Sequence, residues 1–163
     1  FAELTKHVHD PVRLTLVGKG DSEDALRKLT ASLQIEDAVT FAGFVARKDM
    51  PAVYHSADIF VLPSFSEGMS IGLLEAMASA LPVVVTANGG TDQLVADGKN
   101  GFIIAWGDVQ ALTEALVKLV TAKELWSKMG AESRRIAEQL SWATYAERYL
   151  EYCRSLSTTK RVQ

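Results

Sequence analysis

Cysteine is almost absent from this sequence, and so are long apolar runs and clusters of positive charge. The single cysteine, Cys153, excludes an internal disulfide and favours a reducing compartment. No apolar run reaches the roughly 18 residues that a membrane-spanning helix needs. The 17 basic residues are scattered among 20 acidic ones, and the net charge is −3. This balance argues against a surface for nucleic acids or anionic membranes.

Motifs for metals and for common phosphate loops are also missing. No Cys, His and carboxylate group has the spacing of metal ligands. His7 and His9 stand two residues apart in a polar stretch, where a solvated pair is the simpler interpretation. The turn at residues 18–20 matches neither a GxGxxG motif nor a P-loop. Cys153 has no nearby His in the sequence, which argues against a thiol nucleophile.

An initiator methionine and a signal peptide are missing as well. The first residues, Phe1 to Lys6, read as helical sequence, with an early acidic residue and no long apolar stretch after it. The length of 163 residues suits one domain, and the 48% apolar share is enough for a core. We expect a fragment of a longer protein, with a partial domain at residues 1–155 and a polar tail at 156–163.

Short runs of Val, Ile and Leu alternate with segments of helical periodicity. Strands are predicted at residues 12–17, 38–41, 58–62, 81–85 and 102–104. Helices are predicted at about residues 22–34, 48–56, 70–79, 91–96, 108–121, 123–139 and 142–155. Continuous apolar strands indicate a parallel sheet that is covered on both faces. The sequence therefore predicts an α/β fold, a Rossmann-like doubly wound parallel sheet.

Ligands of such sheets bind beyond the carboxyl ends of the strands. Four predicted loops lie at this edge, at residues 18–20, 43–47, 63–70 and 86–91. The pair Gly89-Gly90 lies in the last of them and is equally well explained as a plain turn before a helix. Farther along, aromatic residues recur at helical spacing and predict a helix face packed on the domain, with a partner-binding face as the alternative. They are Trp142, Tyr145, Tyr149 and Tyr152.

Two glutamates stand out in the loop and helix at residues 63–78. Glu75 is the one carboxylate among apolar and small neighbours, and no Lys or Arg occurs between Lys48 and Lys99. A buried carboxylate without a partner is costly, so we expect Glu75 to meet a ligand. Glu67 precedes it by eight positions, in the loop before the helix. The structural alternatives are that Glu75 caps a neighbouring backbone amide and that Glu67 is a solvated loop residue.

The chemistry of this segment suits a ligand with hydroxyl groups beside a phosphate. Ser70 is a predicted N-cap, and the free amides of the first helical turn attract a phosphate. Helical side chains tilt toward the N-terminus, so Glu75 reaches toward the edge from about 6 Å inside the helix. One carboxylate accepts two hydroxyl hydrogen bonds, as the vicinal diol of a ribose offers.

The stretch 63–78 reads PSFSEGMSIGLLEAMA, and it is followed by LPVVV at 81–85 and NGG at 88–90. Together these segments resemble glycosyltransferase family 4, retaining enzymes of the GT-B fold that use nucleotide sugars. Flanking segments agree with the resemblance over residues 1–155. They are LVGKG at 16–20, VTFAGFV at 39–45, YHSADIFVLP at 54–63 and LVADGKNGF at 94–102.

The resemblance implies a role for each matching position. Glu75 would hold the ribose hydroxyls, and Glu67, the implied catalytic residue, would meet hydroxyls of the donor sugar. The backbone of the Gly68–Ile71 stretch would lie against the sugar and the diphosphate. At the other strand ends, Phe44 and Val45 would face the base, and Gly18 would let the phosphates approach. The implied donor-binding residues within the helix entry are thus Gly68, Met69, Ser70 and Ile71.

The chain departs from the family pattern in two ways. Met69 and Ser70 stand where many members have Phe and Gly, which indicates a subgroup. The Arg and Lys that neutralise the diphosphate in the family would precede Phe1, together with the first strand and the amino-terminal acceptor domain. The resemblance therefore implies the carboxyl-terminal, donor-binding half of a GT-B enzyme without its first strand. Because that strand lies in mid-sheet, we expect an exposed strand edge or marginal stability.

The expected activity is transfer of a hexose from a nucleoside diphosphate sugar to an acceptor, with retention of configuration. No metal or other cofactor is expected, and the fragment alone is expected to be inactive. The expected location is cytoplasmic, with the inner face of a membrane reached only through the missing domain. The alternatives are a non-catalytic nucleotide-sugar-binding module and a relative of nucleotide-sugar epimerases.

Overall fold

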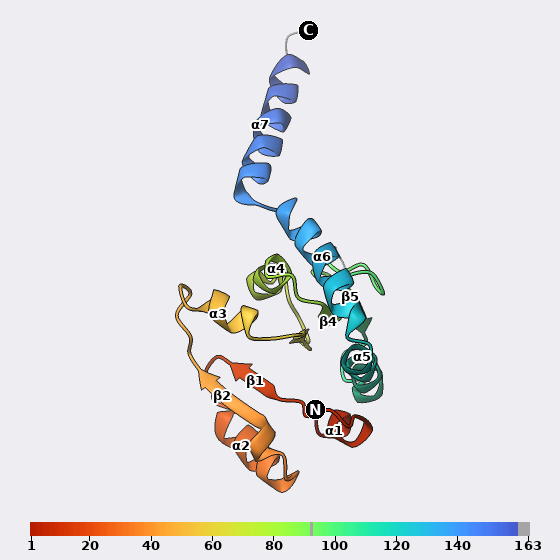
Figure 1. Ribbon diagram of the computed structural model, residues 1–163. Helices are drawn as coiled ribbons and strands as arrows, with labels where there is room; N and C mark the ends of the chain where they lie inside the picture. The colour runs from red at the N-terminus through yellow and green to blue at the C-terminus, as the bar shows by residue number, and fades with distance from the viewer. Residues whose placement is uncertain (92, 160–163) are drawn as a thin grey trace.

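A computed structural model describes residues 1–91 and 93–159, with the side chains of 157–159 left aside. Helices and strands alternate along most of the chain (Figure 1). In chain order they are α1 (Ala2–His7), β1 (Leu14–Val17), α2 (Glu23–Ser32), the 3₁₀ turn η1 (Glu36–Ala38), β2 (Val39–Gly43), α3 (Met50–His55), β3 (Phe60–Leu62), α4 (Ile71–Ala78), β4 (Val83–Thr86), β5 (Gly101–Ile104), α5 (Val109–Thr121), α6 (Glu124–Glu138) and α7 (Trp142–Thr159).

All strand pairs are parallel, as the continuous apolar runs predict, but the described strands form two sheets. One sheet pairs β1 with β2, and the other has the order β3-β4-β5. Among the described strands, β1 pairs only with β2 and β3 only with β4, so each of these strands has one side without a strand partner. Each of these two edges presents unpaired backbone amides and carbonyls.

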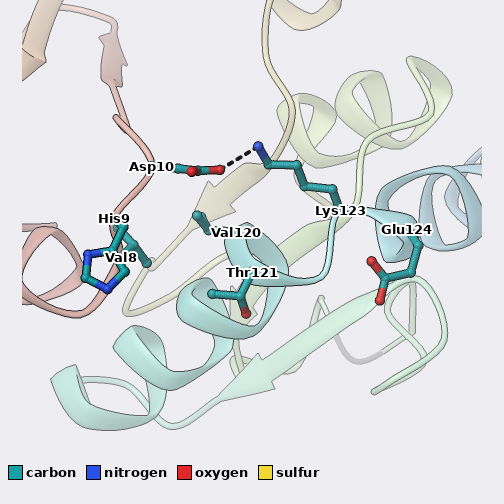
Figure 2. A pocket seen from close by; sticks show the side chains of 7 residues that line it. All are labelled: Val8, His9, Asp10, Val120, Thr121, Lys123 and Glu124. Atoms are coloured by element: carbon teal, nitrogen blue, oxygen red, sulfur yellow. Dashed lines mark hydrogen bonds and ion pairs between the residues drawn. The ribbon is translucent and has the colours of Figure 1, made fainter.

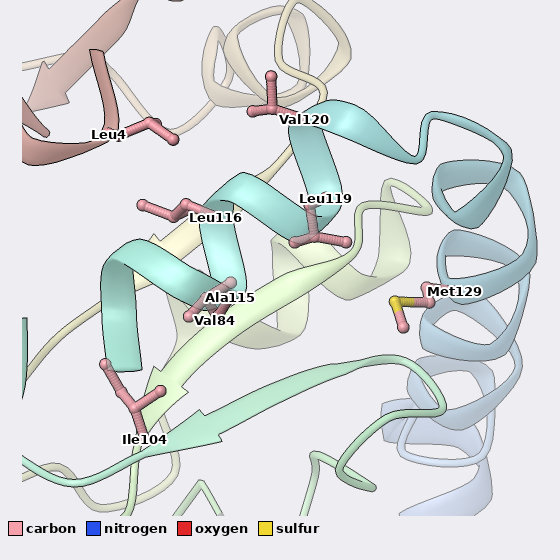
Figure 3. Packing of buried hydrophobic residues seen from close by; sticks show 8 residues of the cluster. All are labelled: Leu4, Val84, Ile104, Ala115, Leu116, Leu119, Val120 and Met129. Atoms are coloured by element: carbon pink, nitrogen blue, oxygen red, sulfur yellow. The ribbon is translucent and has the colours of Figure 1, made fainter. Parts of the chain in front are cut away.

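The core lies around β4, the middle strand of the larger sheet, and all four of its residues are buried. Val84 faces α5 and joins the cluster drawn in Figure 3, which is completed by Leu4 of α1 and Met129 of α6. Val83 and Val85 face the opposite side, where Leu73 and Met77 of α4 cover them. Helices thus cover both faces of this sheet, and the predicted doubly wound α/β class is confirmed for it.

The smaller sheet has much less support. No residue of β1 or α2 is fully buried, and Leu26 and Leu29 of α2 are 41% and 51% exposed. A leucine on this helix therefore loses only about half of its contact with water on folding. Because apolar burial supplies most of the folding free energy, we place the stability of the domain in β3–β5 with α4, α5 and α6.

The prediction for the aromatic face of the last helix is wrong. Trp142 is 84% exposed, and Tyr145, Tyr149 and Tyr152 are also exposed. Helix α7 leads away from the rest of the domain at the top of Figure 1. A helical stripe shows which face of a helix is apolar, but it does not show what covers that face. The helix also continues through residues 156–159 of the predicted tail, and 160–163 lie outside the described residues.

The predicted helix at 91–96 is replaced by a single turn in its described part, and Asp92 lies outside the described residues. The amides of Leu94 and Val95 donate to the Thr91 carbonyl at 2.9 and 3.0 Å. Beyond this turn, the Asn100 side chain bonds the Ala96 amide at 2.8 Å and the Leu94 carbonyl at 3.3 Å. These backbone groups would otherwise continue a helix, so the asparagine ends it.

Candidate functional site

The two glutamates lie at the carboxyl edge of the larger sheet. The loop at 63–70 leaves β3 and leads into α4, and the loop at 87–91 leaves the neighbouring strand β4. Since β3 and β4 are adjacent and parallel, these loops lie side by side at one end of the sheet. The structure therefore brings the predicted segments 63–70 and 86–91 together.

Helix α4 begins as predicted, with Ser70 as its N-cap. The Ser70 hydroxyl accepts from the Leu73 amide at 3.3 Å, and the Ser70 carbonyl accepts from the Leu74 amide at 3.1 Å. Of the described hydrogen bonds, none uses the amides of Ile71 and Gly72. With the helix dipole, these amides suit an anionic group at this end of the helix.

Glu75 is half-buried, with 31% of its side chain exposed, so the expectation of burial on all sides is wrong. Its Oε2 accepts from the Tyr54 hydroxyl at 3.2 Å, and its Oε1 lies 3.8 Å from Nε of Arg47. Arg47 stands just before the stretch between Lys48 and Lys99, which contains no other Lys or Arg, and Tyr54 lies within that stretch as an uncharged donor. Among the described residues, no backbone amide donates to this carboxylate, which excludes the capping alternative there. An exposed oxygen therefore remains open to a ligand.

Tyr54 is nearly buried, and this changes its ionisation. Removal from water raises the pKa of its phenol to about 12, and the negative charge of Glu75 and the hydrogen bond to it act in the same direction. The phenol is therefore neutral at physiological pH and donates a hydrogen bond to Glu75. Sequence reasoning missed Tyr54, although a tyrosine on a short helix with Met50 and Val53 at apolar positions signals a hydroxyl placed in a core.

Glu67 is held by a hydrogen bond within its own loop, and that loop is in turn bonded to residues 86–91. The Ser64 hydroxyl donates to Glu67 Oε1 at 3.1 Å. The Ser64 carbonyl in turn accepts from the Thr86 hydroxyl and, at 3.4 Å, from the Asn88 side-chain amide. The hydroxyl of Thr91 bonds the Thr86 carbonyl at 2.7 Å and the Asn88 side-chain oxygen at 3.1 Å. The 86–91 loop therefore supports the loop that carries Glu67. Because Glu67 is bonded into this network, the alternative of a solvated loop residue without partners does not fit.

Gly90 makes the closest approach between these two loops. A β-carbon there would lie 2.6 Å from the Gly68 carbonyl carbon, closer still to its oxygen, and 2.8 Å from the Glu67 carbonyl oxygen. Ordinary van der Waals contact begins at 3.4 Å, so only glycine fits. Gly89 differs, since its φ of +80° suits a turn and open space surrounds it. The pair is thus more than a plain turn, because the missing side chain of Gly90 allows the backbone of Glu67 and Gly68 to lie directly against the 86–91 loop.

The other predicted positions lie at the ends of β1 and β2. Gly18 has a φ of +123° and open space where a β-carbon would be, and its amide donates to the Gly43 carbonyl at 2.8 Å. Phe44 is 73% exposed, and Val45 is half-buried. Arg47, in the same loop, reaches Glu75, so the loop of Phe44 and Val45 extends to the α4 site although the two sheets are not paired.

Exposed apolar side chains occur on the same loop and helix start as the two glutamates. Met69 and Ile71 at the start of α4 are exposed, as are Phe65 and Trp106, whose rings meet edge to face with centroids 5.0 Å apart. Neither aromatic residue was singled out from the sequence, because each is isolated in its own loop and only the fold brings them together.

Two hollows lie away from this edge. One, of about 410 Å³, is lined by His9, Asp10 and Lys123, and the last two form an ion pair at 2.6 Å (Figure 2). Lys123 lowers the pKa of the Asp10 carboxyl through this hydrogen bond and its charge. The other, of about 740 Å³, lies between α1 and α5. The first hollow is thus lined by a surface ion pair, and neither hollow contains Glu67 or Glu75. Within the described residues, no group of three or more His, Cys, Asp or Glu side chains is arranged to hold a metal.

Comparison with known proteins identifies the family. Residues 1–136 match the family described as glycosyl transferases group 1. The chain belongs to this family. It is 34% identical over 146 residues to the putative glycosyltransferase EpsD of Bacillus subtilis (strain 168), covering 90% of this chain and 38% of that protein. It is 31% identical over 153 residues to a GDP-mannose-dependent α-(1-6)-phosphatidylinositol monomannoside mannosyltransferase of Mycobacterium tuberculosis, covering 89% and 40%.

Solved structures share the fold of this chain. HepE of Anabaena, determined in complex with UDP, superposes with a TM-score of 0.83 and 25% identity, over 94% of this chain and 44% of HepE. The carboxyl-terminal domain of the group 1 protein LpcC of Francisella tularensis superposes with a TM-score of 0.75, and at 23% identity this shows the fold alone. The fold is that of GT-B carboxyl-terminal domains, and the chain spans well under half of the first relatives. In the described part of the chain, no helix has the length and hydropathy to cross a membrane.

Proposed function

We propose that this chain is the donor-binding half of a retaining glycosyltransferase of family 4 that transfers a hexose from a nucleoside diphosphate sugar. The observation that carries the proposal is the Glu75 carboxylate, which is half-exposed, held by side chains and free of backbone amides. It lies on the same sheet edge as Glu67 and the capped start of α4. Relatives that are GDP-mannose-dependent and a structural neighbour that binds UDP support a nucleotide-sugar donor.

Each part of the edge receives a part of the donor. Glu75 accepts the ribose hydroxyls, and the first-turn amides of α4 with the backbone at Gly68–Ile71 receive the diphosphate. Glu67 accepts hydrogen bonds from hydroxyls of the donor sugar and is the proposed catalytic residue at the sugar ring. Phe44 and Val45 contact the base, and Gly18 leaves room for the phosphates.

The reaction breaks the bond between the anomeric carbon and the diphosphate oxygen, so negative charge grows on the leaving group. The α4 N-terminus stabilises that charge electrostatically, together with the Arg and Lys that the resemblance implies upstream. Because these groups neutralise the diphosphate, the proposed transfer needs no metal. Activity of the full-length enzyme that survives chelation with EDTA fits this proposal, and loss of activity restored by a divalent ion contradicts it.

The proposal also includes an acceptor domain upstream and a cytoplasmic location, with membrane contact only through that domain. Residues 1–155 alone should bind the donor weakly and transfer nothing. Calorimetric titration with UDP, GDP and ADP tests the central point, because one of the three should bind. Proton NMR of the full-length enzyme's product tests retention, since the anomeric configuration must equal that of the donor.

A further inference from the structure

Tyr54 connects α3 to the functional carboxylate across 21 positions of sequence. Its hydroxyl lies 3.2 Å from Glu75 Oε2, and only 7% of the residue is exposed. The ring packs in a cluster with Ala76 and Leu81 and meets Phe60 edge to face, with centroids 6.1 Å apart. Packing on several sides fixes the ring, so the position of the hydroxyl is also fixed.

The two partners of Glu75 differ in their mobility. Tyr54 is rigid and nearly buried, whereas the Arg47 side chain is 85% exposed and lies 3.8 Å from Oε1. An exposed ion pair at this distance contributes little and is easily displaced. The arrangement thus holds one carboxylate oxygen firmly and leaves the other on the accessible side.

The Tyr54 hydroxyl also lies close to the first turn of α4. A β-carbon at Gly72 would be 3.7 Å from this hydroxyl and 3.8 Å from the Ser70 hydroxyl. The Tyr54 hydroxyl therefore lies beside the helix cap as well as beside Glu75. A single hydroxyl thereby fixes the acceptor carboxylate relative to the helix end that suits an anion.

We propose that Tyr54 is a positioning residue of the nucleotide site, which orients Glu75 so that its Oε1 meets the ribose hydroxyls. This inference rests on the proposed function. Without the hydroxyl, the Glu75 side chain turns among several rotamers and loses that oriented oxygen. The tyrosine touches Glu75 and not the ligand, so its effect on binding depends on the carboxylate.

A double-mutant cycle tests this dependence in the full-length protein. Titrations of UDP, GDP and ADP first identify the diphosphate that binds, and that one serves as the probe. Tyr54→Phe keeps the ring and should raise the dissociation constant about 10- to 100-fold, the range for a charged hydrogen bond. In a Glu75→Ala background the same change should alter it less than about twofold. Tyr145→Phe removes a hydroxyl from the exposed face of α7 and serves as the matched control.

The outcomes separate the inference from the proposed function. Unchanged binding in Tyr54→Phe, with binding weakened in Glu75→Ala, overturns the inference alone. An equal effect of Tyr54→Phe in both backgrounds also overturns it, because the tyrosine then acts through the core. Absence of binding in the unaltered protein overturns both. If Tyr54→Phe fails to fold, NMR of ¹³Cζ-labelled tyrosine decides on the unaltered protein: the Tyr54 signal should shift on titration, and a stationary signal overturns the inference.

Discussion

Gly90 offers the sharpest test of how the two loops at the sheet edge depend on each other. In a Gly90→Ala variant the new β-carbon would lie 2.6 Å from the Gly68 carbonyl carbon, where ordinary contact begins at 3.4 Å. The backbone at Glu67 and Gly68 must therefore move by about 0.8 Å or more, because the atoms met are backbone carbonyls and not the end of a flexible side chain. Overpacking of this kind costs about 1–3 kcal/mol of unfolding free energy.

The functional loss should exceed the loss of stability. Displacement of a catalytic group by about 1 Å can cost on the order of 100-fold in rate. Because Glu67 moves with its loop, we expect transfer by the full-length enzyme to fall about 10- to 100-fold under conditions where the variant remains folded. Initial-rate assays with the preferred donor measure this, and urea unfolding measures stability.

Gly130 is a matched control for Gly90. A β-carbon at Gly130 would meet the Ala80 backbone, with its carbonyl carbon 2.9 Å away, where α6 lies against the end of α4. Gly130→Ala should therefore lose similar stability and keep its activity within about threefold once folded. Equal losses of activity in the two variants, or full activity in Gly90→Ala, would refute the proposed support of the Glu67 loop.

Three further predictions follow from contacts elsewhere in the domain. Arg47→Ala should change the unfolding free energy by less than about 0.5 kcal/mol in urea denaturation, because an 85% exposed ion pair contributes little. Leu119→Ala in the core should cost about 2–5 kcal/mol, whereas Leu29→Ala on α2, where the leucine is 51% exposed, should cost less than about 1; equal costs would contradict the uneven core. The pKa of Tyr54, raised to about 12, predicts a stabilising contribution that is complete below about pH 10 and lost as the pH rises toward 12. Ultraviolet titration should show a late tyrosine step that Tyr54→Phe abolishes, and a step unchanged in that variant contradicts the assignment.

The sequence predicted the larger sheet well because its signals are local. Continuous apolar runs such as Val83–Val85 identify strands buried on both faces, and Ser70 before an apolar helix identifies the cap. The helix at 91–96 failed because the Asn100 side chain, several residues farther along, takes its backbone partners. A pattern within residues 91–96 cannot show that a side chain outside them will bond these backbone groups.

The candidate site was predicted in part for the same reason. Glu67 and Glu75 share one segment, and their place on a loop and a helix can be read directly. Tyr54 and Arg47 reach Glu75 from other elements, and the sequence gives no distance between them. Gly90 was noted as half of a turn, but the requirement for glycine arises from the Gly68 carbonyl of a different loop. Helix α7 shows the same limit, since its aromatic face has no cover among the described residues.

The central claim is that Glu75 holds the ribose of a nucleotide. Calorimetric titration of Glu75→Ala with whichever of UDP, GDP or ADP binds the unaltered protein tests it most directly. Loss of one or two charged hydrogen bonds predicts a dissociation constant at least about 10-fold higher, while Glu67→Ala, which removes a sugar contact, should stay within about threefold. Unchanged affinity in Glu75→Ala would contradict the account.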